Sequence, residues 1–211
     1  MFRLAARVSL LVCVSFILRP CISFCQSPSP APIIGRWRSL ETSKGGIGAI
    51  YEFHSDGTAD FSPGAVVEMP WRIENGQIVF PSATTNGPEQ KMTLKWLGDN
   101  QLSLVPAGES SGVELTRVGN RSDPADPLVG EWIESREMDG HKLQAHWLLG
   151  PGGKGLFLLP FVTRHGRFSI TGSDLRIEMP DASPANFTFK LKDDVLILSK
   201  PQGSSSRYAR F

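Results

Sequence analysis

Gly35-Arg36-Trp37 opens a pattern that the chain repeats, about ninety-five residues later, as Gly130-Glu131-Trp132. Each copy closes with an alternating segment that carries an arginine, Arg117 in the first copy and Arg210 in the second. Between these ends both copies have a glycine turn before a phenylalanine, a strand that begins with an aromatic residue, and an acidic turn before Leu-x-Leu. The sequence is therefore a duplication, and we expect the two copies to share one fold.

Both copies have the hydrophobic pattern of short β-strands. Apolar residues recur at every second position, and clusters of Gly, Asn, Asp or Pro interrupt them, with no amphipathic helical pattern. Ser55-Asp56-Gly57 and Glu74-Asn75-Gly76 are typical of hairpin turns. About eight short strands per copy would form a meander, which can hide its edges by closing into a barrel. We predict an all-β fold of two tandem antiparallel meander barrels, at residues 34–119 and 128–211, joined by a polar linker at residues 120–127.

The N-terminal residues have the pattern of a secretory signal. Arg3 and Arg7 precede an apolar run that is shorter than the roughly 20 residues of a membrane-spanning helix. We predict a signal peptide at residues 1–25, a Pro/Ser-rich tether at residues 26–33, and a secreted or periplasmic protein. The alternative is a bacterial lipoprotein signal, in which Cys25 carries a lipid and anchors the chain to a membrane.

The chain has no basic excess of the kind that favours nucleic acid. Its formal net charge is +1, and residues 1–25 contain three arginines and no acidic residue, so the remaining chain has a net charge of −2. Nucleic-acid-binding domains use a surplus of Lys and Arg to neutralise phosphates. All three cysteines also lie in residues 1–25, so we expect the mature chain to be stabilised by a packed core without disulfides.

The histidines do not form a catalytic or metal-binding pattern. A nucleophilic triad needs a Ser, Thr or Cys beside a histidine that a carboxylate orients, and no Gly-x-Ser-x-Gly elbow accompanies His54, His141, His146 or His165. A strand would point His141 and His146 to opposite faces, and we expect His54 and His146 to be solvated. No phosphate-binding glycine loop or dinucleotide motif is present. We therefore expect a protein that is not an enzyme and that holds no metal and no cofactor.

Each copy contains a Gly-x-Trp at its start and an arginine in its last strand: Gly35, Trp37 and Arg117, and Gly130, Trp132 and Arg210. With these residues the chain resembles the lipocalin-like, or calycin, barrels. The resemblance implies that the arginine of each copy lies across the tryptophan ring of the same copy, because the first and last strands of a closed barrel are neighbours. We call each such Trp–Arg contact a seam. The copies are shorter than a typical lipocalin, and a second motif of the family is missing.

The run Gly155-Leu-Phe-Leu-Leu-Pro-Phe-Val162 is apolar at consecutive positions, whereas an antiparallel strand with one solvated face should alternate. The simplest interpretation is a buried contact with the other barrel. A surface for a partner, a membrane or ligand entry is one alternative, and packing within a loop is another.

Together these patterns predict an exported, non-enzymatic tandem lipocalin-like protein that serves as a binding or envelope-interaction module, through its loops and the surface at residues 156–161. The alternative is a carrier of a small apolar ligand in the second barrel, where Ala145, Gly155 and Gly166 leave the most room. An enzyme or an enzyme inhibitor is a third interpretation. The expected partner is an unknown protein or a small apolar ligand, with no nucleic acid, and a membrane only if Cys25 is lipidated.

Overall fold

The computed structural model describes residues 31–82, 87–120 and 125–211. The predicted signal peptide, Cys25, the first part of the tether and residues 121–124 of the linker lie outside the described residues. No helix in the described part is both long enough and apolar enough to cross a membrane. The elements are η1 (Ala31–Ile33), β1 (Gly35–Ser39), β2 (Ile47–Phe53), β3 (Thr58–Glu68), β4 (Arg72–Glu74), β5 (Gln77–Phe80), β6 (Gln90–Gly98), β7 (Gln101–Pro106), β8 (Val113–Arg117), β9 (Gly130–Met138), β10 (His141–Leu149), η2 (Pro151–Gly153), β11 (Gly155–Pro160), β12 (Arg164–Thr171), β13 (Asp174–Glu178), β14 (Ala185–Lys192), β15 (Val195–Ser199) and β16 (Ser205–Arg210).

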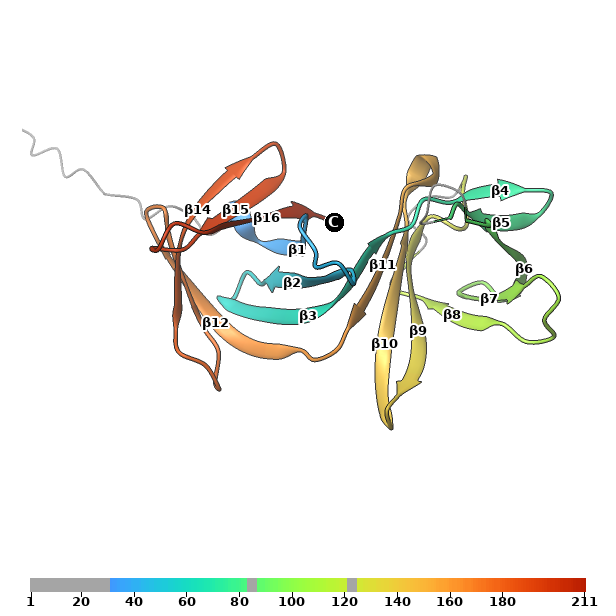
Figure 1. Cartoon of the computed structure of the whole chain (residues 1–211), viewed down its shortest axis with the longest axis horizontal. Helices are drawn as coiled ribbons and strands as arrows, with labels where there is room; N and C mark the ends of the chain where they lie inside the picture. Colours follow the sequence, from blue (N-terminus) through green and yellow to red (C-terminus); the bar gives the residue numbers. More distant parts are fainter. Residues whose placement is uncertain (1–30, 83–86, 121–124) are drawn as a thin grey trace, which may run out of the picture.

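The prediction of an all-β chain is confirmed, and eight of the strands close into an antiparallel barrel (Figure 1). The order around this barrel is β1-β2-β3-β12-β13-β14-β15-β16, and β16 pairs back to β1. Two ladders join the copies here: Trp37 is the register partner of Arg210 between β1 and β16, and Phe61 is the partner of Arg164 between β3 and β12.

The other eight strands, β4 to β11, form a second strand set that continues from β3 in the order β11-β10-β9-β8-β7-β6-β5-β4. The segment that leads from β3 into β4 lies against the start of β11. There the backbone N–H groups of Met69 and Trp71 donate to the carbonyls of Gly155 and Gly153. In Figure 1 the barrel occupies the left of the view and the second strand set the right, with β11 between them.

The two copies of the duplication are mixed in both groups of strands. The barrel takes β1–β3 from the first copy and β12–β16 from the second, while the second strand set takes β4–β8 from the first and β9–β11 from the second. We predicted that residues 34–119 and 128–211 would each close on themselves, and the strand pairing corrects this expectation. The first three strands of each copy group with the later strands of the other copy.

β3 connects the barrel to the second strand set, because its 11 residues are long enough to pair with strands of both. Along one edge, residues 58–61 pair with β12 and residues 64–68 pair with β11. Pro63 and Gly64 are residues typical of a strand end, yet β3 continues through them. Pro63 instead lies where this edge passes from one partner strand to the other, so its missing N–H costs no ladder hydrogen bond. Gly64 allows β11 to approach, because a Cβ there would lie 2.3 Å from the carbonyl oxygen of Leu159.

The interior of the barrel is filled mainly by aromatic and aliphatic side chains from both copies. Phe53 and Phe168 contact edge to face with their ring centroids 5.0 Å apart, and Tyr51 and Tyr208 do so at 5.3 Å. A barrel of eight strands is just wide enough for side chains or one small ligand, so these rings occupy its space. A second buried cluster, which includes Trp132 and Trp147, lies within the second strand set.

The apolar run at residues 155–162 forms β11 and the turn that follows it. Leu156, Leu158 and Leu159 are buried, and Leu158 packs with Ile50 and Val66 of the first copy. The predicted buried contact is confirmed, and its partner is the shared strand β3. Of the surface expected at residues 156–161, these three leucines are therefore covered, whereas Phe161 is exposed.

Candidate functional site

The first seam joins Trp37 to Arg210. The Trp37 ring is fully buried, and its indole N–H donates to the carbonyl of Ile33 at 2.7 Å. The Arg210 guanidinium lies 4.3 Å from the ring centroid and donates to the carbonyls of Pro32 and Ile34. A cation over an indole face is attracted by the ring quadrupole. Arg210 thus fixes both the ring and the chain segment that enters the barrel, which is the end of the predicted tether.

The second seam repeats these contacts at equivalent positions. Trp132 is fully buried, and its indole N–H donates to the carbonyl of Leu128 at 2.9 Å. The guanidinium of Arg117 lies 4.0 Å from the Trp132 centroid and donates to the carbonyls of Pro127 and Val129. Arg117 is itself buried, with 6% of its surface exposed. The two seams therefore have the same chemistry but differ in exposure, because Arg210 lies at the surface.

The prediction that each arginine covers the tryptophan of its own copy is wrong. Arg117 of the first copy covers Trp132 of the second, and Arg210 covers Trp37. The reason is the strand pairing, in which β16 is the neighbour of β1 and β8 is the neighbour of β9. The sequence specifies a Trp–Arg contact, but two similar copies offer each tryptophan two equivalent arginines.

The backbone geometry explains why each seam begins with a glycine. Gly35 has φ 123°, and a Cβ on it would lie 2.6 Å from a terminal nitrogen of Arg210. A side chain there would displace the guanidinium from Trp37. Gly130 has φ 147° at the equivalent position of the second seam. The six residues predicted as seam residues thus stabilise the fold, and the candidate ligand site lies elsewhere.

An open groove of about 710 Å³ lies where β3, β12 and β13 meet. Sites for small molecules have volumes of about 300 to 1,000 Å³. The groove is lined by titratable and charged side chains together with two apolar residues: His54, Asp60, His165, Arg167 and Glu178, with Met179 and Pro180. Residues of both copies line it, because β3 of the first copy pairs with β12 of the second.

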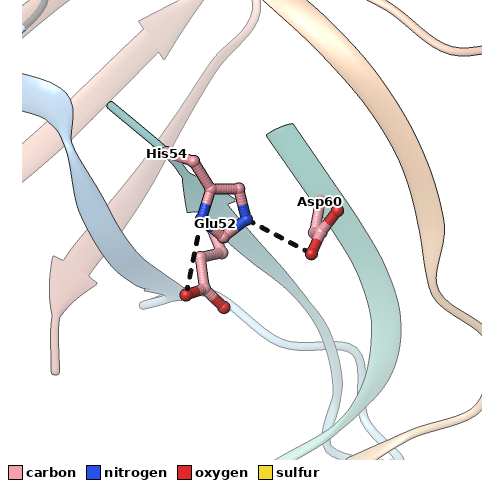
Figure 2. A group of neighbouring side chains, drawn as sticks. All are labelled: Glu52, His54 and Asp60. Atoms are coloured by element: carbon pink, nitrogen blue, oxygen red, sulfur yellow. Dashed lines mark hydrogen bonds and ion pairs between the residues drawn. The ribbon is translucent and has the colours of Figure 1, made fainter. Parts of the chain in front are cut away.

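Figure 2 shows the imidazole of His54 between the carboxylates of Glu52 and Asp60. His54 follows the end of β2, and its Nε2 lies 3.4 Å from Oδ2 of Asp60, while its Nδ1 lies 3.9 Å from Oε1 of Glu52. Taking one donor atom from each side chain, all three atoms lie within 4.8 Å of one another. The hairpin between β2 and β3 holds this arrangement, since the backbone N–H of His54 donates to the carbonyl of Thr58.

His165 of β12 reaches the same carboxylate from the opposite side. Its Nδ1 lies 2.7 Å from Oδ1 of Asp60. The strand register explains this contact: Asp60 is the partner of Glu52 across β2 and β3, and of His165 across β3 and β12. Directly opposed residues on adjacent antiparallel strands have neighbouring side chains. Glu52, Asp60 and His165 therefore form a row across three strands, with His54 beside it.

A second group of polar contacts joins this row to the second strand set. Arg36 lies 3.9 Å from Glu52 and donates to Glu131 at 2.7 Å, and His146 contacts the other oxygen of Glu131 at 2.7 Å. Burial raises the pKa of Glu131, but the hydrogen bonds from His146 and Arg36 outweigh this effect and lower the pKa to about 2. Glu131 is therefore ionised at neutral pH and completes an ion pair between the copies.

The structure changes the expectations for the histidines. His54, expected to be solvated, is half-buried and contacts two carboxylates. His146, also expected to be solvated, is half-buried and hydrogen-bonded to Glu131. His141 is exposed. The two-residue spacing of Glu52 and His54 indicates in the sequence that both side chains lie on one strand face. The contact of His165 with Asp60 depends on the pairing of β12 with β3, which has no local signal in the sequence.

The lipocalin-like resemblance identified from the two Gly-x-Trp motifs has no counterpart in the comparisons. Family models, curated proteins and solved structures were each compared with the chain, and none of them matches it.

Proposed function

We propose that this chain is an exported, non-enzymatic binding protein, and that its ligand occupies the groove beside His54, Asp60 and His165. The groove itself is the observation that carries the proposal. It is concave, open to solvent and of the size of small-molecule sites, and its walls combine both signs of charge with imidazole groups. Export follows from the signal-like N-terminal pattern, with a lipid anchor at Cys25 as the alternative.

The architecture that we propose is a pair of lipocalin-like barrels that have exchanged their first three strands. The equivalence of the two seams, atom for atom, supports a second barrel in the strand set β4 to β11. The hydrogen bonds from Met69 and Trp71 to the start of β11 support its closure. In this arrangement the segments β3 and β11–β12 cross between the barrels and bring residues of both copies to the groove.

The groove favours a ligand that carries charged groups over a purely apolar one. Arg167 and Glu178 present opposite charges, and Met179 and Pro180 can contact an adjacent apolar part. Carriage of an apolar ligand inside the barrel has less support, because Phe53, Phe168 and their neighbours fill the interior. We therefore propose a small amphipathic or zwitterionic ligand.

A blocked groove provides the test. His165 is exposed, so His165→Trp would fill part of the groove without disturbing the core. The matched control is His141→Trp, at the exposed first residue of β10. A panel of amino acids, dipeptides, dicarboxylates and fatty acids is titrated into each protein by calorimetry. We expect saturable binding of a charged member to the unmodified chain and to His141→Trp, and its loss in His165→Trp. Binding that survives in His165→Trp, or binding of fatty acids alone with a change in tryptophan fluorescence, would contradict the proposal.

A further inference from the structure

We propose that Glu52, His54, Asp60 and His165 form a binding site for a divalent transition-metal ion of the zinc class. This inference rests on the proposed function only in placing the ligand at the same groove. The donor set is two imidazoles and two carboxylates, contributed by three neighbouring strands and the hairpin turn between two of them. Zinc binds such nitrogen and oxygen donors, and four of them complete a tetrahedral site.

The distances among the donors are close to those that a bound ion requires. Two donors that lie about 2.1 Å from a tetrahedral zinc ion are about 3.4 Å apart. His54 Nε2 and Asp60 Oδ2 already have a separation of 3.4 Å. The donors of Glu52, His54 and Asp60 lie within 4.8 Å of one another, so a contraction of the flexible, half-exposed Glu52 side chain brings the third into range.

His165 supplies the fourth donor. It faces the same carboxylate as His54, from the strand on the other side of β3. Its side chain is 77% exposed, so it can rotate from its hydrogen bond with Asp60 to a bound ion without repacking the core. The pair of imidazoles also gives the site its selectivity, because magnesium and calcium prefer sites made only of oxygen donors.

The electrostatics and the access to the site agree with a cation. Glu52 and Asp60 bring two negative charges close together, and the Arg36 guanidinium lies 3.9 Å from Glu52, so it offsets them only in part. A divalent ion would offset both charges. His54, Asp60 and His165 line the open groove, which gives an ion a path from solvent.

The test is calorimetric titration of the untagged full chain with zinc chloride, supported by the visible absorption of the cobalt complex. We expect one zinc ion per chain, and an affinity reduced at least about 10-fold in His54→Gln and Asp60→Asn. His165→Gln should weaken binding less, because Glu52, His54 and Asp60, whose donor atoms already lie within 4.8 Å of one another, all remain. His141→Gln is the matched control and should bind zinc as the unmodified chain does. Circular dichroism checks whether each variant is folded. If Asp60→Asn fails to fold, His54→Gln provides the measurement instead.

The inference is overturned if His54→Gln binds zinc as tightly as the unmodified chain, or if His141→Gln loses as much affinity as His54→Gln. The same protein separates this failure from failure of the proposed function. A chain that binds a charged organic compound in the groove but shows no histidine-dependent zinc binding retains the proposed function and loses the metal site. A chain that binds zinc through His54 but no compound of the panel retains the metal site alone.

Discussion

Replacing Arg210 or Arg117 by methionine tests the strand exchange, because each substitution removes one guanidinium from one seam. Arg210 lies at the surface and contributes a cation–π contact and two hydrogen bonds to carbonyls that water can reach. We expect its loss to lower the free energy of unfolding by about 2 kcal/mol. Arg117 makes the same contacts while buried, and its loss leaves the carbonyl of the buried Val129 without this hydrogen bond. The expected loss is about 4 kcal/mol.

Urea unfolding measures these two losses, and the indole N–H resonances of the five tryptophans show which ring each arginine covers. The resonances are assigned with single Trp→Phe variants. Arg210→Met should shift the resonance of Trp37 and leave that of Trp132 in place, and Arg117→Met should do the reverse. If Arg210→Met instead shifts the Trp132 resonance alone, each copy closes on itself and our strand assignment is refuted. An equal loss of stability in both variants would contradict the argument from burial.

Two further predictions concern the linker and the ion pair between the copies. A protease site inserted in residues 120–127 should give fragments that still co-elute in size-exclusion chromatography after cleavage, since they share the ladders β1–β16, β3–β12 and β8–β9; fragments that separate would contradict the exchange. For Glu131, the folded-state pKa of about 2 lies below the usual 4.5, so its ionised form stabilises the fold above pH 4.5 and this contribution is lost as the pH falls toward 2. Glu131→Gln should therefore cost about 2 kcal/mol at neutral pH, allowing for solvent screening, and the difference in urea stability should narrow through this range. A difference that stays constant from pH 7 to about 2 would show that the charge of Glu131 is not its cause.

The local elements of this fold could be predicted from the sequence, because alternation and turn residues depend on near neighbours. The hairpin at Asn75 and Gly76, both with positive φ, is one example. The partners of β3 could not be predicted in the same way. Pro63 and Gly64 are ordinary signals of a strand end, and only the position of β11 and β12 along one edge turns them into a passage between partners. Pairing between distant strands leaves no periodic signal, and a duplication adds a second set of suitable edges.

The candidate site was missed for the same reason. His54 and Glu52 lie on one strand face, which the alternation indicates, and Asp60 follows on the next strand of a predicted hairpin. The contact with His165 spans 105 positions and requires β12 to pair with β3. If each copy closed on itself, His165 would belong to a different barrel from Glu52, His54 and Asp60. The sequence alone therefore does not bring the four donors together.

The duplication also shows that the fold does not need this polar row. The positions equivalent to Glu52, Asp60 and His165 are occupied by Leu148, Leu156 and Glu68. Leu148 is the register partner of Leu156 across β10 and β11, and Leu156 is the partner of Glu68 across β11 and β3. Both leucines pack in the apolar cluster at the junction. These positions thus carry two leucines and a glutamate in one half, and two carboxylates and a histidine in the other. Because half-buried carboxylates cost free energy unless they are compensated, leucines like Leu148 and Leu156 are the less costly choice for a purely structural role at the positions of Glu52 and Asp60. The difference between the halves therefore favours a ligand-binding role for this row.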